Sequence, residues 1–509
     1  MTWLAPLYGF LRRPYSRIAA LHQDALTPQN RWLAFLVKQG ARTAYGKAVG
    51  LSSEMSYDQF RRTVPIQPYE ELYPWIERHL RGEKDVLWPG AVRWFARSSG
   101  TTNDRSKYIP ITSESLRFNH FRASKQLFAT YLTLYKDHTH LLEGKIISIG
   151  GSHQVSHLGQ HARYGDLSAV LLANMPAFYR PFRAPSLDIA LIASWEEKLP
   201  RMVEALLSER HKIVGLAGVP TWTILLFEAL LHRTGAANIL EVFPRFEAVF
   251  HGAVSFTPYE KLFAQYLPSP QVRYMEIYNA SEGFIAFQDT VESRDMLLMA
   301  DHGIFYEFIP FSAWEAGRWE AIPLSEIEVG ETYALVLTTV GGLWRYLIGD
   351  TVRFTSKMPP RLRIVGRTRH YINAFGEEVM IEQAESALHF ACQVTGAQVR
   401  DYTVAPVFMD AGRRGAHQWL IEFVQMPRDM QEFIHTLDRK LRELNSDYDA
   451  KREGDLALGL PEVVALPPDT FYQWLKRKGR LGGQNKVPRL STERIYADEI
   501  LAMVHSLSQ

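Results

Sequence analysis

Residues 98–107 read SSGTTNDRSK, a run of small hydroxyl-bearing residues and glycine that ends in a lysine. Such residues bury little apolar surface, but their backbone N–H groups and hydroxyls can bind phosphate oxygens, and Gly100 permits close approach of the chain. Lys107 adds a mobile positive charge. The segment therefore predicts a phosphate-binding loop between two ordered elements, with an ordinary Ser/Thr turn as the alternative.

On the C-terminal side of this segment, short β-rich runs alternate with helical patterns, which favours an α/β fold with sheets covered by helices. Beyond residue 304 the strands follow one another closely, as in an antiparallel or barrel-like part. The β-rich runs are 146–149, 213–216, 248–251, 273–278, 304–309, 333–339 and 362–365, and the helical patterns are 113–135, 194–209, 222–231 and 258–266.

The N-terminal side is predicted to be helical. Residues 30–38 place Trp32, Phe35 and Leu36 at the spacing of one helix face. Residues 69–80 follow Pro68 and have acidic residues near their start, but Pro74 interrupts the run, so we expect the regular helix to begin only there.

After about residue 380 the pattern changes to three helices and three strands, enough for a small α+β domain with its own core. The join before it is rich in polar residues and glycine. We therefore predict a large N-terminal domain over residues 1–366, a hinge over 367–378, and a small mobile C-terminal domain over 379–509.

Two further motifs carry acidic residues at the ends of predicted strands. In YNASEG, residues 278–283, Glu282 is well placed to hold Mg²⁺ against a nucleotide phosphate, and Tyr278 can stack on a purine. In WRYLIGDT, residues 344–351, Asp350 can accept hydrogen bonds from two ribose hydroxyls. A polar turn and a Gly-Asp β-turn are the respective alternatives.

A fourth motif lies near the C-terminus, where residues 476–489 read KRKGRLGGQNKVPR. A solvated basic segment is one interpretation. In the other, the neighbouring glycines and proline hold Lys486 in a defined loop, where its ammonium can meet a reacting carboxylate or an α-phosphate.

Composition and charge exclude several classes of protein. The 509 residues contain 57 Lys+Arg and 55 Asp+Glu, a balance that argues against a dedicated nucleic-acid binder. The single cysteine, Cys392, rules out an intramolecular disulfide and a multi-cysteine metal site. No run approaches 18 apolar residues, and the N-terminus lacks the charge order of a signal peptide, so we expect a cytoplasmic protein that does not insert into a membrane.

In their order and separation, the four motifs resemble those of the adenylate-forming enzymes: acyl-CoA synthetases, peptide-synthetase adenylation domains and luciferases. More closely, the sequence resembles a bacterial-type member of the auxin-responsive Gretchen Hagen family of acyl acid–amido synthetases. Stretches that carry this resemblance include VPIQPYEEL at 64–72, HGAVS at 251–255, FYEFIP at 305–310, YALVLTT at 333–339 and GLWRY at 342–346. At the hinge, plant members carry a lysine where this chain reads GEEV, residues 376–379.

The resemblance implies roles for individual residues. Glu282 would hold Mg²⁺, and Lys486 and Lys107 would join it in catalysis. The ATP-binding set would be Ser98, Ser99, Gly100, Thr101, Thr102, Lys107, Ala253, Tyr278, Ser281, Asp350 and Arg367. The candidates for the acyl pocket are Val219, Thr221, Trp222, Leu171 and Met175.

The reaction that the resemblance implies joins a small carboxylic acid to an amine, with an amino acid as the expected amine, through an acyl-adenylate formed from ATP with Mg²⁺. The residues show no convincing Ser/His/Asp or Cys/His arrangement for a covalent enzyme intermediate. We cannot name a general base; His153 and His251 lie near the motifs but suit structural hydrogen bonding better. An acyl-CoA synthetase and a non-enzymatic nucleotide sensor are the competing interpretations.

Overall fold

The structure, a computed structural model, describes residues 11–102, 105–149, 156–158, 161–192, 194–368, 371–410, 413–455, 457–478 and 488–507. For residues 98–102, 105, 106, 158, 258, 455 and 507 it describes the backbone only. None of the helices within these ranges has the length and apolar character needed to cross a membrane.

One large mixed sheet runs through the molecule, in the order β13-β12-β14-β15-β16-β11-β10-β9-β8-β7-β3-β6. From β9 to β6 neighbouring strands are parallel, and from β9 to β13 they are antiparallel. This confirms the α/β class and the antiparallel character predicted beyond residue 304. The strands are β3 (Lys145–Ser148), β6 (Arg183–Ala184), β7 (Ile213–Gly218), β8 (Ala248–Gly252), β9 (Arg273–Ala280), β10 (Gly283–Gln288), β11 (Met296–Leu298), β12 (Ile304–Pro310), β13 (Ile322–Pro323), β14 (Thr332–Thr339), β15 (Tyr346–Lys357) and β16 (Pro360–Arg367).

A second sheet, in the order β2-β1-β5-β4, contains most of the Ser/Thr-rich segment. Strands β1 (Trp94–Thr102) and β2 (Arg105–Ile111) form an antiparallel hairpin, while β5 (Ala162–Gly165) and β4 (Ser156–Leu158) complete the sheet. The expectation of a loop over 98–107 is therefore wrong in extent. Cross-strand pairing satisfies backbone N–H groups there, and threonine suits strands. The register shifts between Ser98 and Thr102, so the pairing is irregular next to the hairpin tip.

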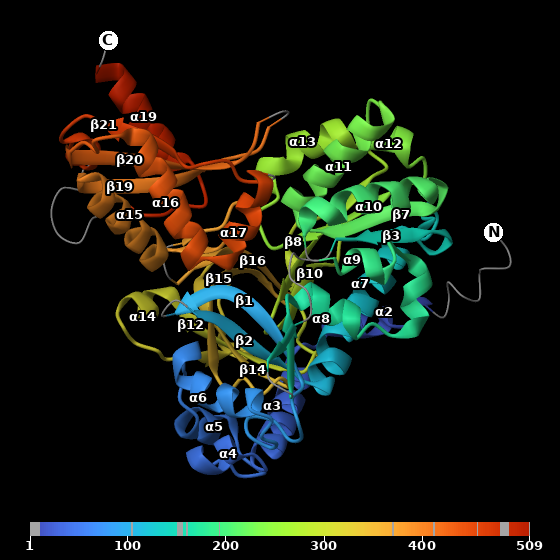
Figure 1. Ribbon diagram of the computed structural model, residues 1–509. Coiled ribbons are helices and arrows are strands. Elements are labelled where there is room, and N and C mark those ends of the chain that lie inside the picture. Colours follow the sequence, from blue (N-terminus) through green and yellow to red (C-terminus); the bar gives the residue numbers. More distant parts are fainter. Residues whose placement is uncertain are drawn as a thin grey trace.

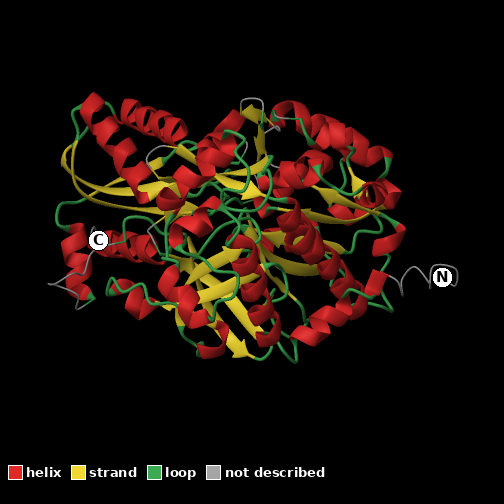
Figure 2. Ribbon diagram, turned by 90° about the horizontal axis from the view of Figure 1, so that it is seen from below, coloured by secondary structure: helices red, strands yellow, loops and turns green. Residues whose placement is uncertain are grey.

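Helices cover the sheets on the outside of the molecule, as Figures 1 and 2 show. The helix α6 runs unbroken from Tyr69 to Leu80 with Pro74 inside it, so the expectation that it begins only at Pro74 is wrong. Its buried face, with Leu72 and Ile76, outweighs the one backbone hydrogen bond that a proline removes. The helices up to residue 315 are α2 (Tyr15–Leu21), α3 (Leu26–Gly40), α4 (Ala44–Val49), α5 (Tyr57–Thr63), α6 (Tyr69–Leu80), α7 (Phe121–Leu134), α8 (Leu167–Ala173), α9 (Leu187–Ala190), α10 (Trp195–Ser208), α11 (Pro220–Thr234), α12 (Ile239–Val242), α13 (Glu260–Tyr266) and α14 (Phe311–Glu315).

The C-terminal part forms the orange-to-red lobe in Figure 1. Its sheet β19-β20-β21 and three of its helices match the predicted strands and helices, whereas α17 and α19 were not predicted. After the short pair β17 (Tyr371–Ile372) and β18 (Val379–Met380), its elements are α15 (Ile381–Thr395), β19 (Gln398–Val407), β20 (Ala416–Gln425), α16 (Met430–Leu444), α17 (Ser446–Arg452), β21 (Glu462–Leu466), α18 (Thr470–Arg477) and α19 (Ile495–Leu507). The division at 366 and 378, and the mobility of this lobe, stay predictions.

A buried ion pair ties two motifs of the family resemblance together. Arg345 and Glu307 meet through two hydrogen bonds of 2.9 Å, with side chains only 6% and 1% exposed. Arg345 also donates to the carbonyl of Val64 at 2.9 Å, and Gln67 pairs with the backbone on both sides of Tyr346. The stretch 64–72 is thereby fixed against the strand that carries Asp350.

Replacing Arg345 with methionine is expected to lower the free energy of unfolding by about 3–5 kcal/mol, because Glu307 would remain buried without its counter-charge. Urea denaturation measures this, with Arg353→Met, an exposed arginine of β15, as the matched control. Adding Glu307→Leu to Arg345→Met should recover part of the loss. A single variant as stable as the wild type would contradict the assigned role.

Candidate functional site

Lys107 of β2 and Glu282 of the hairpin between β9 and β10 lie close enough for each to shift the pKa of the other, although 175 positions separate them in the sequence. Both side chains are partly buried. Burial lowers the pKa of Lys107, and the nearby Glu282 opposes that shift. Burial likewise raises the pKa of Glu282, against the opposing charge of Lys107. The two motifs therefore place opposite charges in one low-dielectric site.

Asp350 lies at the centre of a second group of contacts in the same site. The guanidinium Nε of Arg367 lies 2.9 Å from Asp350 Oδ1, and Tyr278 donates its hydroxyl to Asp350 Oδ2. Arg367 Nη2 also lies 2.9 Å from Glu378 Oε1. Asp350 is only 6% exposed, yet each carboxylate oxygen can accept a further hydrogen bond. Strands β9, β15 and β16 thus bring three predicted residues into direct contact.

The two groups belong to one electrostatic environment. Asp350 raises the pKa of Glu282, and Arg367 lowers it, after the larger effects of burial and Lys107. Tyr346 is buried, and burial together with the nearby carboxylate of Glu282 raises the pKa of its hydroxyl well above its ordinary value. The structure therefore gathers residues of three of the four motifs into one site. Lys486 of the fourth motif lies outside the described residues.

Ala253 and Ser281 occupy tight backbone positions next to this site. Ala253 directly follows β8 and has φ 72°, a conformation that costs a non-glycine residue about 1–3 kcal/mol. Its carbonyl accepts a hydrogen bond from Asn373 Nδ2 at 3.3 Å, from within the predicted hinge. Ser281 and Glu282 are the two residues that join paired Ala280 and Gly283. Both positions follow strands that are neighbours in the large sheet.

The candidates for the acyl pocket lie near the C-terminal lobe. Thr221 and Trp222 are buried in α11, and Thr221 donates to the carbonyl of Phe375 at 3.1 Å. The Trp222 ring packs against Trp195 and lies 3.9 Å from the ammonium of Lys451 of α17. Val219 precedes α11, Leu171 lies in α8, and Met175 lies just beyond α8. The predicted acyl role of all five residues stays a prediction.

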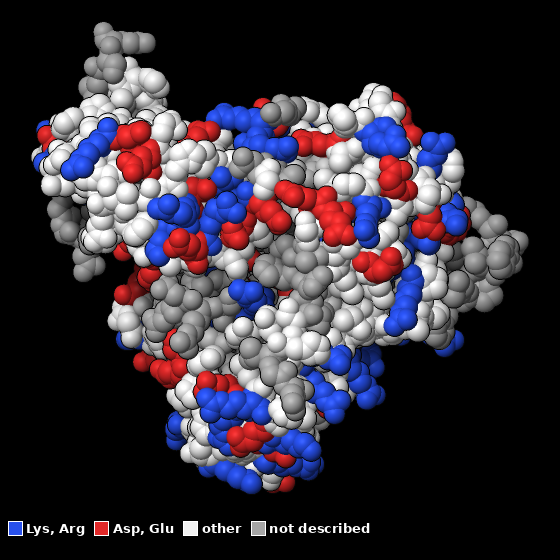
Figure 3. All heavy atoms as spheres, viewed as in Figure 1, with Lys and Arg blue, Asp and Glu red and all other residues white. Residues whose placement is uncertain are grey.

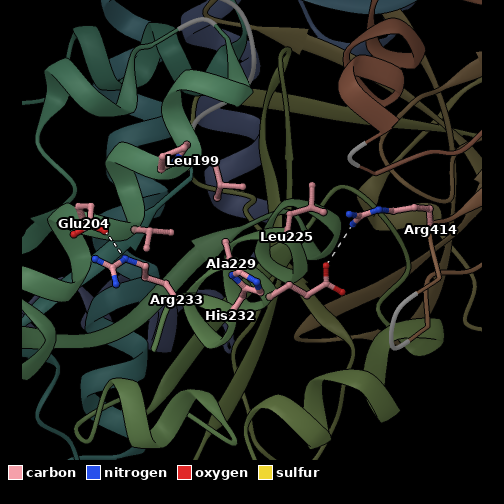
Figure 4. A pocket seen from close by; sticks show the side chains of 10 residues that line it. Leu199, Glu204, Leu225, Ala229, His232, Arg233 and Arg414 are labelled. Carbon is pink, nitrogen blue, oxygen red and sulfur yellow. Dashed lines mark hydrogen bonds and ion pairs between the residues drawn. The ribbon is translucent and has the colours of Figure 1, made fainter. Parts of the chain in front are cut away.

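A pocket of about 520 Å³ lies between α10, α11 and the C-terminal lobe (Figure 4). Ion pairs cross it from Arg414 to Glu228 at 3.4 Å and from Arg233 to Glu204 at 2.8 Å. None of the five acyl-pocket candidates lines it. The predicted acyl pocket and this pocket are therefore different places.

Sequence reasoning missed several residues of the site. Glu378 completes the ion-pair chain with Arg367, the Tyr371 ring lies 5.0 Å from the same guanidinium, and Tyr346 lies beside Glu282. The adjacent carboxylates Glu377 and Glu378 in the predicted hinge were the usable signal in the sequence, because they follow the predicted ATP-binding residue Arg367 by only about ten positions. The structure does not describe the side chains of Ser98, Ser99, Thr101 and Thr102, nor any part of His153.

Within the described ranges, no three His, Cys, Asp or Glu side chains come together as a metal site. Surface charge is mixed as well, since basic and acidic side chains alternate over the face shown in Figure 3. The absence of nucleic-acid partners stays a prediction. The concentration of ionisable groups around Lys107, Glu282, Asp350 and Arg367 is the feature that distinguishes the site.

Comparison with solved structures defines the class of protein. The chain aligns with AtGH3.15 acyl acid amido synthetase in complex with 2,4-DB at a TM-score of 0.64, with 17% identity and coverage of 97% of this chain and 96% of the other. It also aligns with 2-hydroxyisobutyryl-CoA ligase in complex with 2-HIB-AMP and CoA, at a TM-score of 0.56, 13% identity and coverage of 94% and 93%. The fold is that of the adenylate-forming enzymes.

The family follows from the sequence. Residues 15–272 match the GH3 family N-terminal domain, 297–367 the central domain and 382–495 the C-terminal domain. The chain belongs to the GH3 family, which confirms the resemblance. Its relatives include the probable indole-3-acetic acid-amido synthetase GH3.1 of Arabidopsis thaliana, 23% identical over 93% of this chain and 90% of the relative, and the jasmonoyl–L-amino acid synthetase JAR4 of Nicotiana attenuata, 22% identical over 96% and 94%.

Proposed function

We propose that this protein is an ATP-dependent ligase that adenylates a small carboxylic acid and transfers the acyl group to an amine, most simply that of an amino acid. The observation that carries the proposal is the joining of Lys107, Glu282 and Asp350, from three distant stretches, in one partly buried site. Membership of a family whose curated relatives are amido synthetases supports amide formation as the second step.

In the first step a substrate carboxylate oxygen attacks the α-phosphorus of ATP, and the bond to the β-phosphate oxygen breaks. Pyrophosphate leaves, and an acyl-adenylate remains. The barrier is lowered mainly by fixed positive charge near the phosphates, where Lys107 is available. Asp350, held by Arg367 and Tyr278, would accept hydrogen bonds from the ribose hydroxyls and fix the nucleotide in register. Lys486 would add a second ammonium.

In the second step the amine nitrogen attacks the acyl carbon, the carbon–oxygen bond to AMP breaks, and the amine loses a proton. No covalent bond to the protein is needed. His251 is 4% exposed in β8, and burial lowers its pKa to about 3, so it is a poor general base at neutral pH. Closure of the lobe around the site would exclude water from the adenylate.

Glu282 fits a role as a ligand of Mg²⁺. Magnesium is commonly held by one or two carboxylates together with substrate phosphates, and a lone carboxylate beside a nucleotide site suits that pattern. When bound, the ion would neutralise charge on the phosphates. Glu282 would then supply the protein's ligand and set the position of the triphosphate relative to Lys107. A cytoplasmic location, inferred from the sequence, belongs to the same proposal.

Isotope exchange between pyrophosphate and ATP, dependent on a carboxylic acid, tests the first step. We expect exchange with at least one acid in a broad panel with Mg²⁺, and mass spectrometry should then detect an amide when amino acids are added. A thioester formed with CoA instead of an amide would support an acyl-CoA synthetase. Absence of exchange over the whole panel would favour a nucleotide sensor.

A further inference from the structure

A second polar pocket, of about 450 Å³, lies far along the large sheet from the candidate active site. Its lining includes the first residue of β3, Lys145, the first residue of β6, Arg183, and the side chains of Arg180, Ser186, Ser208 and Glu209. Its volume is within the range of small-molecule sites.

The pocket lies at the opposite edge of the parallel strands from the proposed chemistry. Arg183 pairs with Ile146 near the start of β3, on the edge strand of the sheet. Ala253 and Ser281, in contrast, follow the carboxyl ends of the parallel strands β8 and β9. A ligand in this pocket would therefore occupy a site distinct from that of the nucleotide.

Arg183 is the unusual residue of the pocket. It is only 6% exposed, and its Nε and Nη2 are buried without a hydrogen-bond partner among the described residues. Burial alone lowers its pKa to about 10, with no carboxylate opposing the shift. An isolated buried charge is costly, and proteins normally give it a counter-charge.

Three other arginines of this chain, the buried Arg345 and Arg452 and the half-buried Arg361, show what such a counter-charge looks like. Arg345 binds Glu307 through Nε and Nη2, both at 2.9 Å, and Arg361 binds Asp289 through the same two nitrogens at 3.0 and 2.9 Å. Arg452 binds Asp438 in the same way at 2.7 and 3.0 Å. In Arg183 this pair of donors has no carboxylate.

The remaining charges around the pocket do not supply one. Glu209, the acidic residue of the lining, accepts two hydrogen bonds from Lys145 at 2.7 and 2.8 Å, and Lys212 lies 3.7 Å from it. Arg180 is exposed and makes no ion pair within the described part of the chain. The lining therefore keeps an excess of positive charge, next to the apolar side chains of Pro185, Leu187 and Ala205.

We propose that this pocket is a binding site for a small organic anion, whose carboxylate or phosphate pairs with Arg183 while its apolar part contacts Leu187 and Ala205. Guanidinium groups bind both oxyanions through paired hydrogen bonds, so the two ligand chemistries share one recognition element. Because Nε and Nη2 are themselves buried, binding through them would require the guanidinium to rotate toward the pocket that it lines.

Thermal unfolding tests the proposal with sodium phosphate and sodium propionate as probes, each against sodium chloride at equal ionic strength. We expect at least one probe to raise the unfolding midpoint of the wild type in a saturable way, because a ligand that binds only the folded state stabilises it. Arg183→Met should show no such rise over its own midpoint in chloride.

Two further variants make the outcome decisive. Arg183→Lys keeps the charge but lacks the paired donors. It should therefore bind the effective probe about tenfold or more weakly than the wild type. This variant replaces Arg183→Met in the test if the methionine variant does not fold. Lys107→Met should retain the full rise, which separates this site from phosphate binding at the proposed nucleotide site. Equal rises in wild type and Arg183→Met, equal affinities of wild type and Arg183→Lys, or no rise beyond chloride with either probe would each overturn the proposal.

Discussion

Replacing Lys107 with methionine is expected to slow acid-dependent exchange between pyrophosphate and ATP by roughly a hundredfold or more, the usual effect of removing one preorganised charge from a transition state. Methionine has a similar length and keeps the contact with the ring of Tyr69, over which the ammonium now lies at 5.6 Å. The substitution therefore removes charge with little change in packing. ATP affinity should change much less than the rate.

The pH dependence of the same reaction gives a second measurement. Burial lowers the pKa of Lys107, so its charge is lost at a lower pH than that of an ordinary lysine. At saturating Mg²⁺ the exchange rate should fall as the pH rises through this lowered pKa, and Lys107→Arg should remove that alkaline decline because arginine stays charged. Lys125→Met, a control in α7, should leave both rate and profile unchanged. A Lys107→Met enzyme with wild-type exchange would exclude Lys107 from the chemistry.

The fold was largely predictable because its signals are local. A strand such as β7 is an apolar, β-rich run, and a helix such as α16 shows clear amphipathic periodicity. The errors came where a tertiary contact outweighed a local preference. Pro74 remains helical because the buried face of α6 holds it there, and most of the Ser/Thr-rich segment is strand because β1 pairs with β2 across it.

Individual residues of the candidate site could be proposed from the sequence, but their connections could not. Lys107 was proposed from the Ser/Thr-rich segment, and Glu282 and Asp350 from motifs at the ends of predicted strands. The structure places the three in one electrostatic environment, and their roles stay predictions. The two ion pairs that link Asp350, Arg367 and Glu378 form because the segment after β16 folds back toward that strand. A short sequence motif does not predict such a contact. The lack of an ion-pair partner for Arg183 among the described residues could not be predicted either, because it depends on which side chains the fold places around the guanidinium.

Replacing Asp350 with alanine is expected to weaken ATP binding by about ten- to a hundredfold, the value of one or two hydrogen bonds to a charged group. The loss has two parts. The ribose hydroxyls lose their proposed acceptor, and Arg367 and the Tyr278 hydroxyl lose the carboxylate that now holds them. Isothermal titration with a non-hydrolysable ATP analogue measures the affinity directly.

Tyr278→Phe separates the two parts of this effect. It leaves Asp350 and the aromatic ring in place and removes only the hydroxyl that positions the carboxylate. If Asp350 itself contacts the nucleotide, Tyr278→Phe should weaken binding only a few-fold, well short of the effect of Asp350→Ala. Equal losses in the two variants would mean that Asp350 acts only through the surrounding network, and unchanged affinity in Asp350→Ala would remove it from the nucleotide site. The Tyr278 side chain is 6% exposed. Phenylalanine keeps the aromatic ring, so a large loss of ATP affinity in Tyr278→Phe would not come from lost stacking.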